Sequence, residues 1–122
     1  IQSNTLEINM AKGEDNPIKR AVINAASSGN NTVITGVAGM RFRVLGYHFV
    51  VDSAVAVTWE EGVDIALSGA MSYAAKGGFT VAETYIGCLE TATAGNDLVL
   101  SLSGAVGVRG HLSYQEFEEI TT

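Results

Sequence analysis

The chain has little cysteine, and this scarcity limits how the fold can be stabilised. Cys88 is the only cysteine among 122 residues, so an intrachain disulfide and a cysteine-based metal cluster are both excluded. A lone cysteine flanked by Gly87 and Leu89 is expected to be a small, buried, apolar residue. The domain must therefore be held together by the burial of apolar surface alone.

Positive charge and long apolar runs are scarce as well. The chain has 7 Lys and Arg against 13 Asp and Glu, which gives a formal net charge of −6 at pH 7. Nucleic acids and anionic membranes bind clustered positive charge, and no apolar run approaches the roughly 20 residues of a membrane span. We therefore expect neither as a partner. Charged residues make up 16% of the chain, so Ser, Thr, Asn, Gly and Ala must form much of the surface.

The clearest pattern that is present is an alternation of large apolar with small or polar residues from Leu98 to Tyr114. Successive side chains of a strand point to opposite faces, so this segment has one apolar face. Its apolar positions are Leu98, Leu100, Leu102, Val106, Val108, Leu112 and Tyr114. With a turn at Ser103 and Gly104, the segment is predicted to form a hairpin that covers a core.

Short strands of this kind recur along the chain, whose length fits one domain. A change of apolar face at Gly46 indicates a bulge or bend, and residues 68–78 are expected to form a loop with room for a helical turn over 70–75. About eight strands at a spacing of roughly 8–12 residues predict an all-β, antiparallel β-sandwich of jelly-roll type. The nine candidate segments for these strands lie at residues 18–24, 32–37, 40–51, 55–59, 63–67, 79–81, 85–91, 98–102 and 106–114.

The two ends of the chain differ from the predicted sandwich, which spans residues 18–115. Residues 1–17 end in the only proline and have an apolar residue at every second position from Leu6 to Met10. They are expected to form an extended N-terminal arm that can pair with its own sheet or with a neighbour's. Residues 116–122 are acidic and are expected to fray as a tail.

Two histidines, His48 and His111, each fall within an expected strand. A pair of histidines can hold a metal or transfer protons. Either role needs a third ligand or a carboxylate partner at a defined place, and the sequence indicates none. We therefore expect both side chains to lie at the surface or to make structural hydrogen bonds.

The acidic clusters also give only weak indications of a functional site. Glu60, Glu61 and Asp64 stand near a strand end, but adjacent Glu60 and Glu61 point to opposite faces and cannot address one sugar together. Residues 14–16 (Glu-Asp-Asn) could give oxygen ligands to calcium, yet they lack an alternating calcium-loop pattern. Residues 30–32 (Asn-Asn-Thr) match the glycosylation acceptor pattern, which recurs by chance. The sequence predicts no catalytic, cofactor-binding or metal site, and no enzyme.

The aromatic residues divide between core and possible ligand contacts. Trp59 is in phase with the apolar residues Val55 and Val57, so it is expected in the core. Tyrosines can stack on sugars where their rings are exposed. The four candidates for such stacking are Tyr47, Tyr73, Tyr85 and Tyr114.

The block from Arg43 to Tyr114 resembles small structural proteins of tailed bacteriophages, above all head decoration (cement) proteins of β-sandwich type. The order of several short motifs carries the resemblance. These motifs are RVLGY at 43–47, AVAVTW at 54–59, LSGAM at 67–71, AKGG at 75–78, ETA at 90–92, and the segment 98–114 with its GHLSY end.

The resemblance implies a non-enzymatic homotrimer on the outer capsid surface of a virion, without cofactors, that clamps neighbouring copies of the major capsid protein. Related sandwiches at the tips of tail fibres and spikes imply the alternative, a module that binds a host receptor or surface glycan. Residues 1–42 lie outside the resemblance.

Overall fold

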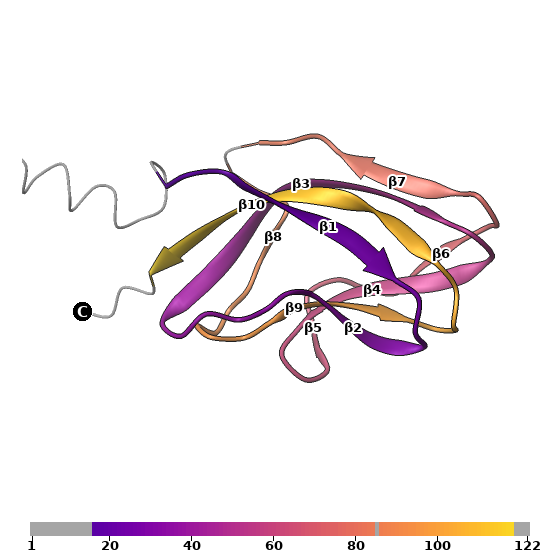
Figure 1. The fold of residues 1–122 in the computed structure, drawn as a ribbon, viewed down its shortest axis with the longest axis horizontal. Coiled ribbons are helices and arrows are strands. Elements are labelled where there is room, and N and C mark those ends of the chain that lie inside the picture. The colour runs from indigo at the N-terminus through magenta and orange to yellow at the C-terminus, as the bar shows by residue number, and fades with distance from the viewer. Residues whose placement is uncertain (1–15, 85, 119–122) are drawn as a thin grey trace, which may run out of the picture.

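The chain forms two antiparallel sheets that pack face to face, as seen in a computed structural model that describes residues 16–84 and 86–118 (Figure 1). The described residues contain ten strands and no helix, so the predicted all-β sandwich is confirmed, with more strands than the expected eight. The expected arm falls almost wholly outside these residues, which include only Asn16 and Pro17 from it.

Sheet A carries the longest strands. Its order is β1 (Lys19–Ala25), β10 (Val108–Glu118), β3 (Met40–Val51) and β7 (Gly78–Val81), and β8 (Leu89–Glu90) also pairs with β3. Sheet B has the order β2 (Gly29–Ile34), β9 (Leu98–Leu102), β4 (Val55–Glu61) and β5 (Ile65–Ala66), and β6 (Met71–Tyr73) also pairs with β4.

The expected closing hairpin is wrong, because β9 and β10 belong to different sheets. β9 pairs with β2 and β4, whereas β10 pairs with β1 and β3. The connection crosses between the sheets and is held where Ser103 N–H donates to Ala56 O (3.0 Å) and Asp52 N–H donates to Gly107 O (2.8 Å). An alternation of apolar and polar residues shows only that one face of a strand is buried. The same pattern is therefore expected for a hairpin and for two strands that face each other across a core.

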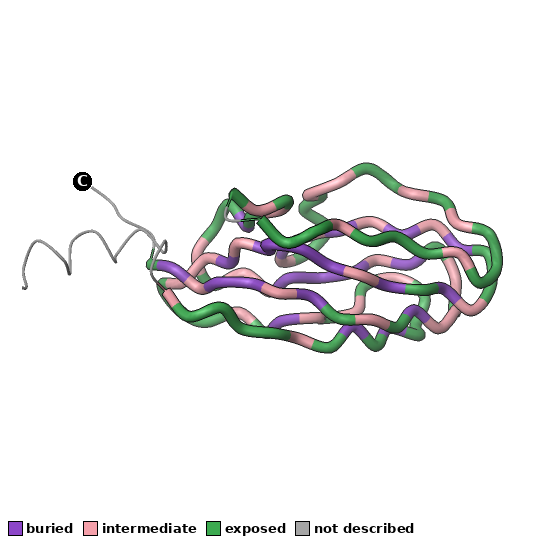
Figure 2. The backbone as a smooth tube through the Cα atoms, turned by 90° about the horizontal axis from the view of Figure 1, so that it is seen from above, coloured by how far each residue is buried: buried purple, intermediate pink, exposed green. Residues whose placement is uncertain are grey.

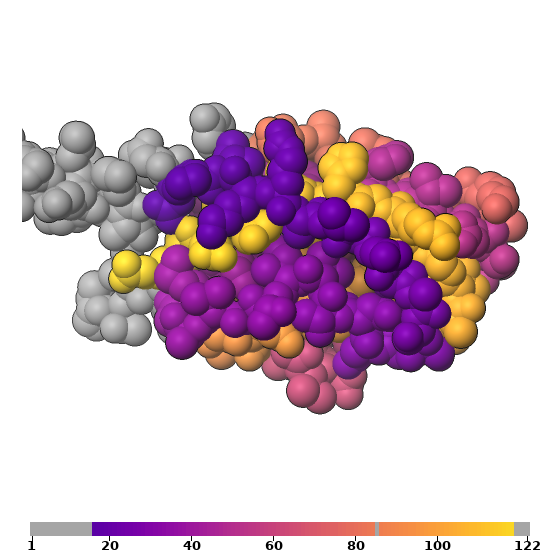
Figure 3. All heavy atoms as spheres, in the orientation of Figure 1, coloured from indigo at the N-terminus to yellow at the C-terminus, as the bar shows by residue number. Residues whose placement is uncertain are grey.

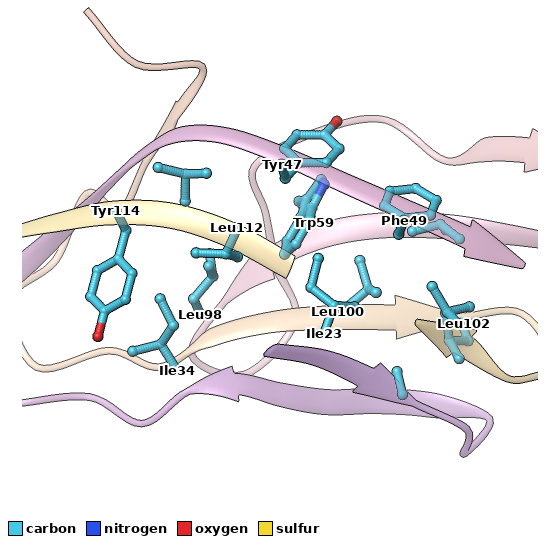
Figure 4. Packing of buried hydrophobic residues seen from close by; sticks show 14 of the residues in the cluster. Ile23, Ile34, Tyr47, Phe49, Trp59, Leu98, Leu100, Leu102, Leu112 and Tyr114 are labelled. Atoms are coloured by element: carbon cyan, nitrogen blue, oxygen red, sulfur yellow. The ribbon is translucent and has the colours of Figure 1, made fainter. Parts of the chain in front are cut away.

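The core lies between the sheets and is built from the alternating apolar positions of the long strands. Trp59 has no exposed surface and packs against Tyr47, with ring centroids 5.1 Å apart (Figure 4). The predicted core position of Trp59 is thus confirmed. Buried residues concentrate along the strands, while the connections are largely exposed (Figure 2). Other buried members include Phe42, Phe49, Val57, Leu98, Leu100, Val108 and Leu112.

The bend predicted at Gly46 is confirmed as a bulge in β3. Ser113 pairs with Gly46 while Tyr114 pairs with Val44, which leaves Leu45 as the extra residue. A Cβ at position 46 would lie 2.7 Å from Val81 O, so only glycine fits there. The bulge therefore separates two halves of the outer face of sheet A.

Several expected boundaries differ from the structure. β2 begins at Gly29, three residues before the expected strand over 32–37, and β6 lies where a helical turn over 70–75 was expected. The strand expected over 85–91 is reduced to β8. β10 continues to Glu118, three residues beyond the expected end of the sandwich, because Phe117 is buried against two arginines. No helix long and apolar enough to span a membrane is found in residues 16–84 and 86–118.

Candidate functional site on the outer face of sheet A

The strand register brings the two histidines together on the outer face of sheet A. His48 of β3 pairs directly with His111 of β10. Val22 of β1 pairs with His111 on one side, and Thr80 of β7 pairs with His48 on the other. We call these four side chains, which cross four strands in one line, the histidine row. The sequence predicted each histidine in a strand but gave no sign that they are neighbours.

The histidine row is accessible and internally ordered. The two imidazole rings have centroids 5.8 Å apart and an interplanar angle of 49°. His48 Nδ1 forms a hydrogen bond of 2.6 Å with Thr80 Oγ1, which confirms the expected structural hydrogen bond for this residue. His111 is exposed, and Val22 is 74% exposed. The row thus combines two imidazoles with an apolar side chain that faces solvent.

A hollow of about 230 Å³ adjoins the histidine row. Its polar lining includes Glu83 and Ser113 beside the two histidines. Such a hollow can hold a few waters, an ion or one small polar group. Its volume lies below the usual 300–1,000 Å³ of a pocket for a drug-sized ligand.

A cross-strand pair of one apolar and one charged residue lies next to the histidine row. Val50 of β3 is 40% exposed and pairs with Arg109 of β10. Arg109 Nη1 donates to Asp52 Oδ2 at 2.9 Å, so its charge is balanced locally. The outer face here presents mixed, largely uncharged surface, which suits contact with another protein more than contact with a polyanion.

Beyond the bulge, the same face is closed by an arginine clamp that the sequence analysis missed. Arg41 and Arg43 both lie over the ring of Phe117, each with its guanidinium carbon 5.1 Å from the ring centroid. Glu90 bridges the two, at 2.8 Å from Arg41 Nη2 and 3.0 Å from Arg43 Nε. The sequence places Arg41 and Arg43 two positions apart, on one face of β3, but it does not indicate their partners from β8 and β10.

The start of the described chain is fastened beside this clamp. Gln115 is 2% exposed, and its Nε2 donates to Asn16 O at 2.7 Å. Asn16 Nδ2 in turn donates to Glu116 O at 2.5 Å. Residues 16–25, indigo in Figure 3, lie beside the yellow of β10. The two hydrogen bonds fix Asn16 against the end of β10.

The acidic residues do not form a site. Glu61 is 1% exposed, and its carboxylate accepts hydrogen bonds from Ala92 N (2.7 Å) and Thr93 N (3.1 Å). Glu60 points to the other face, as expected, and burial together with Asp64 raises the pKa of its carboxyl group. The carboxylates of Glu60 and Glu61 therefore lie in different surroundings, and that of Glu61 holds the loop at Ala92 and Thr93 in place.

The tyrosines expected to stack on sugars are largely unavailable. Tyr47 and Tyr114 are 7% and 8% exposed and belong to the core, where burial raises the pKa of Tyr47. Tyr73 is half-buried, with its ring 5.4 Å from that of Phe49. Tyr85 lies outside the described residues. Alternating residues on the inner face of β3 and β10 carry the first two rings inward, which removes them as ligand contacts.

Other expectations have mixed outcomes. Cys88 is exposed, so its expected burial is wrong, although its Sγ lies 3.5 Å from Val44 O and partial burial raises the pKa of the thiol. Asn30, the acceptor residue of the glycosylation pattern, donates through Nδ2 to Asp64 Oδ1 (3.1 Å). Of the three residues considered as calcium ligands, only Asn16 is described, and its side-chain amide donates to Glu116 O.

No group of three or more His, Cys, Asp or Glu side chains suited to a metal ion occurs in the described part of the chain. Comparison with protein-family models, curated proteins and solved structures found no match. The fold and the histidine row are therefore the basis for a functional proposal.

Proposed function

We propose that this protein is a non-enzymatic structural component of a phage virion, a homotrimeric decoration protein that binds the outer capsid surface and bridges capsomers. The observation that carries the proposal is the outer face of sheet A. There Val22 and Val50 are exposed beside two imidazoles and a locally balanced ion pair. The resemblance of residues 43–114 to head decoration proteins supports the same role.

A decoration protein needs a rigid surface that binds other protein subunits. Stable protein contacts bury about 800 Å² on each partner and combine an apolar centre with a polar rim. Sheet A offers long strands that are cross-linked at one end by the arginine clamp. An N-terminal segment fastened at Asn16 can add main-chain pairing to a neighbour, which depends little on side chains.

Two measurements test the proposal together. Light scattering of the purified protein is expected to give a trimer. Addition to emptied phage heads from the same source is expected to raise the temperature at which the shells rupture. A strict monomer that leaves the shells as fragile as before would overturn the proposal.

A matched pair of variants locates the contact. Val22→Lys places a charge on the outer face of sheet A and is expected to weaken shell binding. Thr32→Lys places the same charge on an exposed position of β2 in sheet B and is expected to bind as the parent does. Both positions face solvent, so both variants should keep the parent's melting temperature. Equal loss of binding in the two variants would exclude the outer face of sheet A as the contact.

A second candidate function is a receptor- or glycan-binding module of a tail fibre or spike. The hollow beside the histidine row favours it, because Thr80, Glu83 and Ser113 offer polar atoms at a concave place. The burial of Tyr47 and Tyr114 weighs against it. A glycan array that shows no signal at high protein concentration would count against this candidate and leave the capsid role intact.

A further inference from the structure

We propose that His48 and His111 together bind one borderline divalent metal ion, of the class of Zn²⁺, Ni²⁺ and Cu²⁺, at the outer face of sheet A. This inference does not depend on the proposed function. Imidazole nitrogen is a preferred ligand of these metals, whereas Mg²⁺ and Ca²⁺ prefer oxygen.

The spacing of the two rings fits a shared ion. Two imidazoles on a tetrahedral ion, with metal–nitrogen distances of about 2.1 Å, have ring centroids about 5.3 Å apart. The centroids of His48 and His111 are 5.8 Å apart. The two residues are direct partners across β3 and β10, so backbone pairing fixes their Cβ atoms. The observed distance is about 0.5 Å longer, so the two rings must move slightly toward each other when the ion binds.

Thr80 orients the His48 ring for this role. A metal-binding histidine usually donates its second ring N–H to an oxygen, which fixes the tautomer. His48 Nδ1 lies 2.6 Å from Thr80 Oγ1, so when Nδ1 carries the proton it donates there and Nε2 keeps its lone pair. Thr80 is thus a positioning residue and not a ligand.

The surroundings allow a cation to approach. The hollow of about 230 Å³ next to the pair has room for the ion and its waters. Glu83 and Ser113 line this hollow and can accept hydrogen bonds from metal-bound water. The nearby positive charge of Arg109 is balanced by Asp52 at 2.9 Å. No third protein ligand joins the pair among the described residues, so water must supply the third ligand that a histidine pair needs, and binding is expected to be weaker than at a site with three protein ligands.

Calorimetric titration of the full chain without a histidine tag tests the proposal, with ZnCl₂ as the probe and MgCl₂ as the control ion. The chain has only these two histidines, so any binding that depends on imidazole comes from this pair. His48→Gln and His111→Gln are each expected to weaken Zn²⁺ binding by about tenfold or more. Thr80→Val is expected to weaken it by about tenfold, while Thr32→Val, a matched exchange in sheet B, leaves it unchanged.

Proton NMR of the two imidazoles gives an independent readout. Both sets of ring signals should shift together as Zn²⁺ is added, and neither should move with Mg²⁺. The variants must keep the parent's melting temperature, which shows that the fold is intact. If the double variant His48→Gln/His111→Gln binds Zn²⁺ as the parent does, or only one ring responds, the proposal is overturned.

Discussion

Glu60 and Glu61 are adjacent in β4, yet their side chains point to opposite faces and have different hydrogen-bonding surroundings. The Glu61 carboxylate is buried and receives hydrogen bonds from two backbone amides and from Asn96 Nδ2 at 3.1 Å. Glutamine at position 61 would replace one acceptor oxygen with a donor that faces other donors. Glu61→Gln is therefore expected to lower the free energy of unfolding by about 1–3 kcal/mol, measured by urea denaturation.

Glu60→Gln is the matched control and is expected to act in the opposite direction. Burial raises the pKa of Glu60 in the folded state, so its contribution to stability is present at low pH and is lost as pH rises through that pKa. The stability of Glu60→Gln relative to the parent should therefore increase between about pH 4 and pH 7. A parallel loss of stability in both variants would show that the two carboxylates share one environment.

Cys88 is exposed but is expected to react slowly at neutral pH. Partial burial raises the pKa of its thiol, and the reactive species is the thiolate. Its rate with iodoacetamide at pH 7 should therefore lie below that of glutathione and keep rising beyond the ordinary thiol pKa. Unfolding in urea should abolish the difference. A native rate equal to that of glutathione would contradict the raised pKa.

At the scale of the element, the pairing of β10 with β3 depends on Gly110. A Cβ at this position would lie 1.8 Å from His48 O and 2.7 Å from Phe49 Cα, both backbone atoms of the partner strand. Gly110→Ala should therefore separate two central strands and cost several kcal/mol of stability, seen as a large fall in melting temperature. Gly104→Ala, where a Cβ meets nothing within 4 Å, should change it little. Similar melting of the two variants would contradict the close approach.

The alternation of apolar and polar residues predicted where strands lie better than it predicted which strands pair. β3 was predicted with its observed bounds, and the bend at Gly46 was visible because the apolar face changes there. The crossing between β9 and β10 could not be predicted, because strands of either sheet show the same alternation of apolar and polar residues. The short strand β6 lies among small residues with weak local preferences, and its pairing with β4 determines its conformation.

At the scale of the molecule, a surface site depends on register, which the sequence does not state. His48 and His111 are 63 positions apart (111 − 48), and only the pairing of β3 with β10 makes them neighbours. The arginine clamp likewise joins β3, β8 and β10. Local patterns can indicate that such residues lie on strands, but only the order of strands in the sheet determines which face and which partner each has.

The point where the N-terminal segment meets the sandwich gives the last prediction. Asn16 is hydrogen-bonded to Gln115 and Glu116, so it belongs to the fold, and under the proposed capsid role residues 1–15 are the part of the expected arm left to pair with a neighbour. Deleting residues 1–15 is expected to weaken binding to capsid shells while changing the melting temperature little, measured by co-sedimentation and calorimetry.

Deleting residues 1–16 is the comparison that separates the two roles. It removes both hydrogen bonds and leaves the 2%-exposed Gln115 side chain without its partner, so it should also lower the melting temperature. If the shorter deletion already lowers the melting temperature as much as the longer one, residues 1–15 stabilise their own domain. The segment would then serve the fold, and binding to the shell would have to come from the outer face of sheet A.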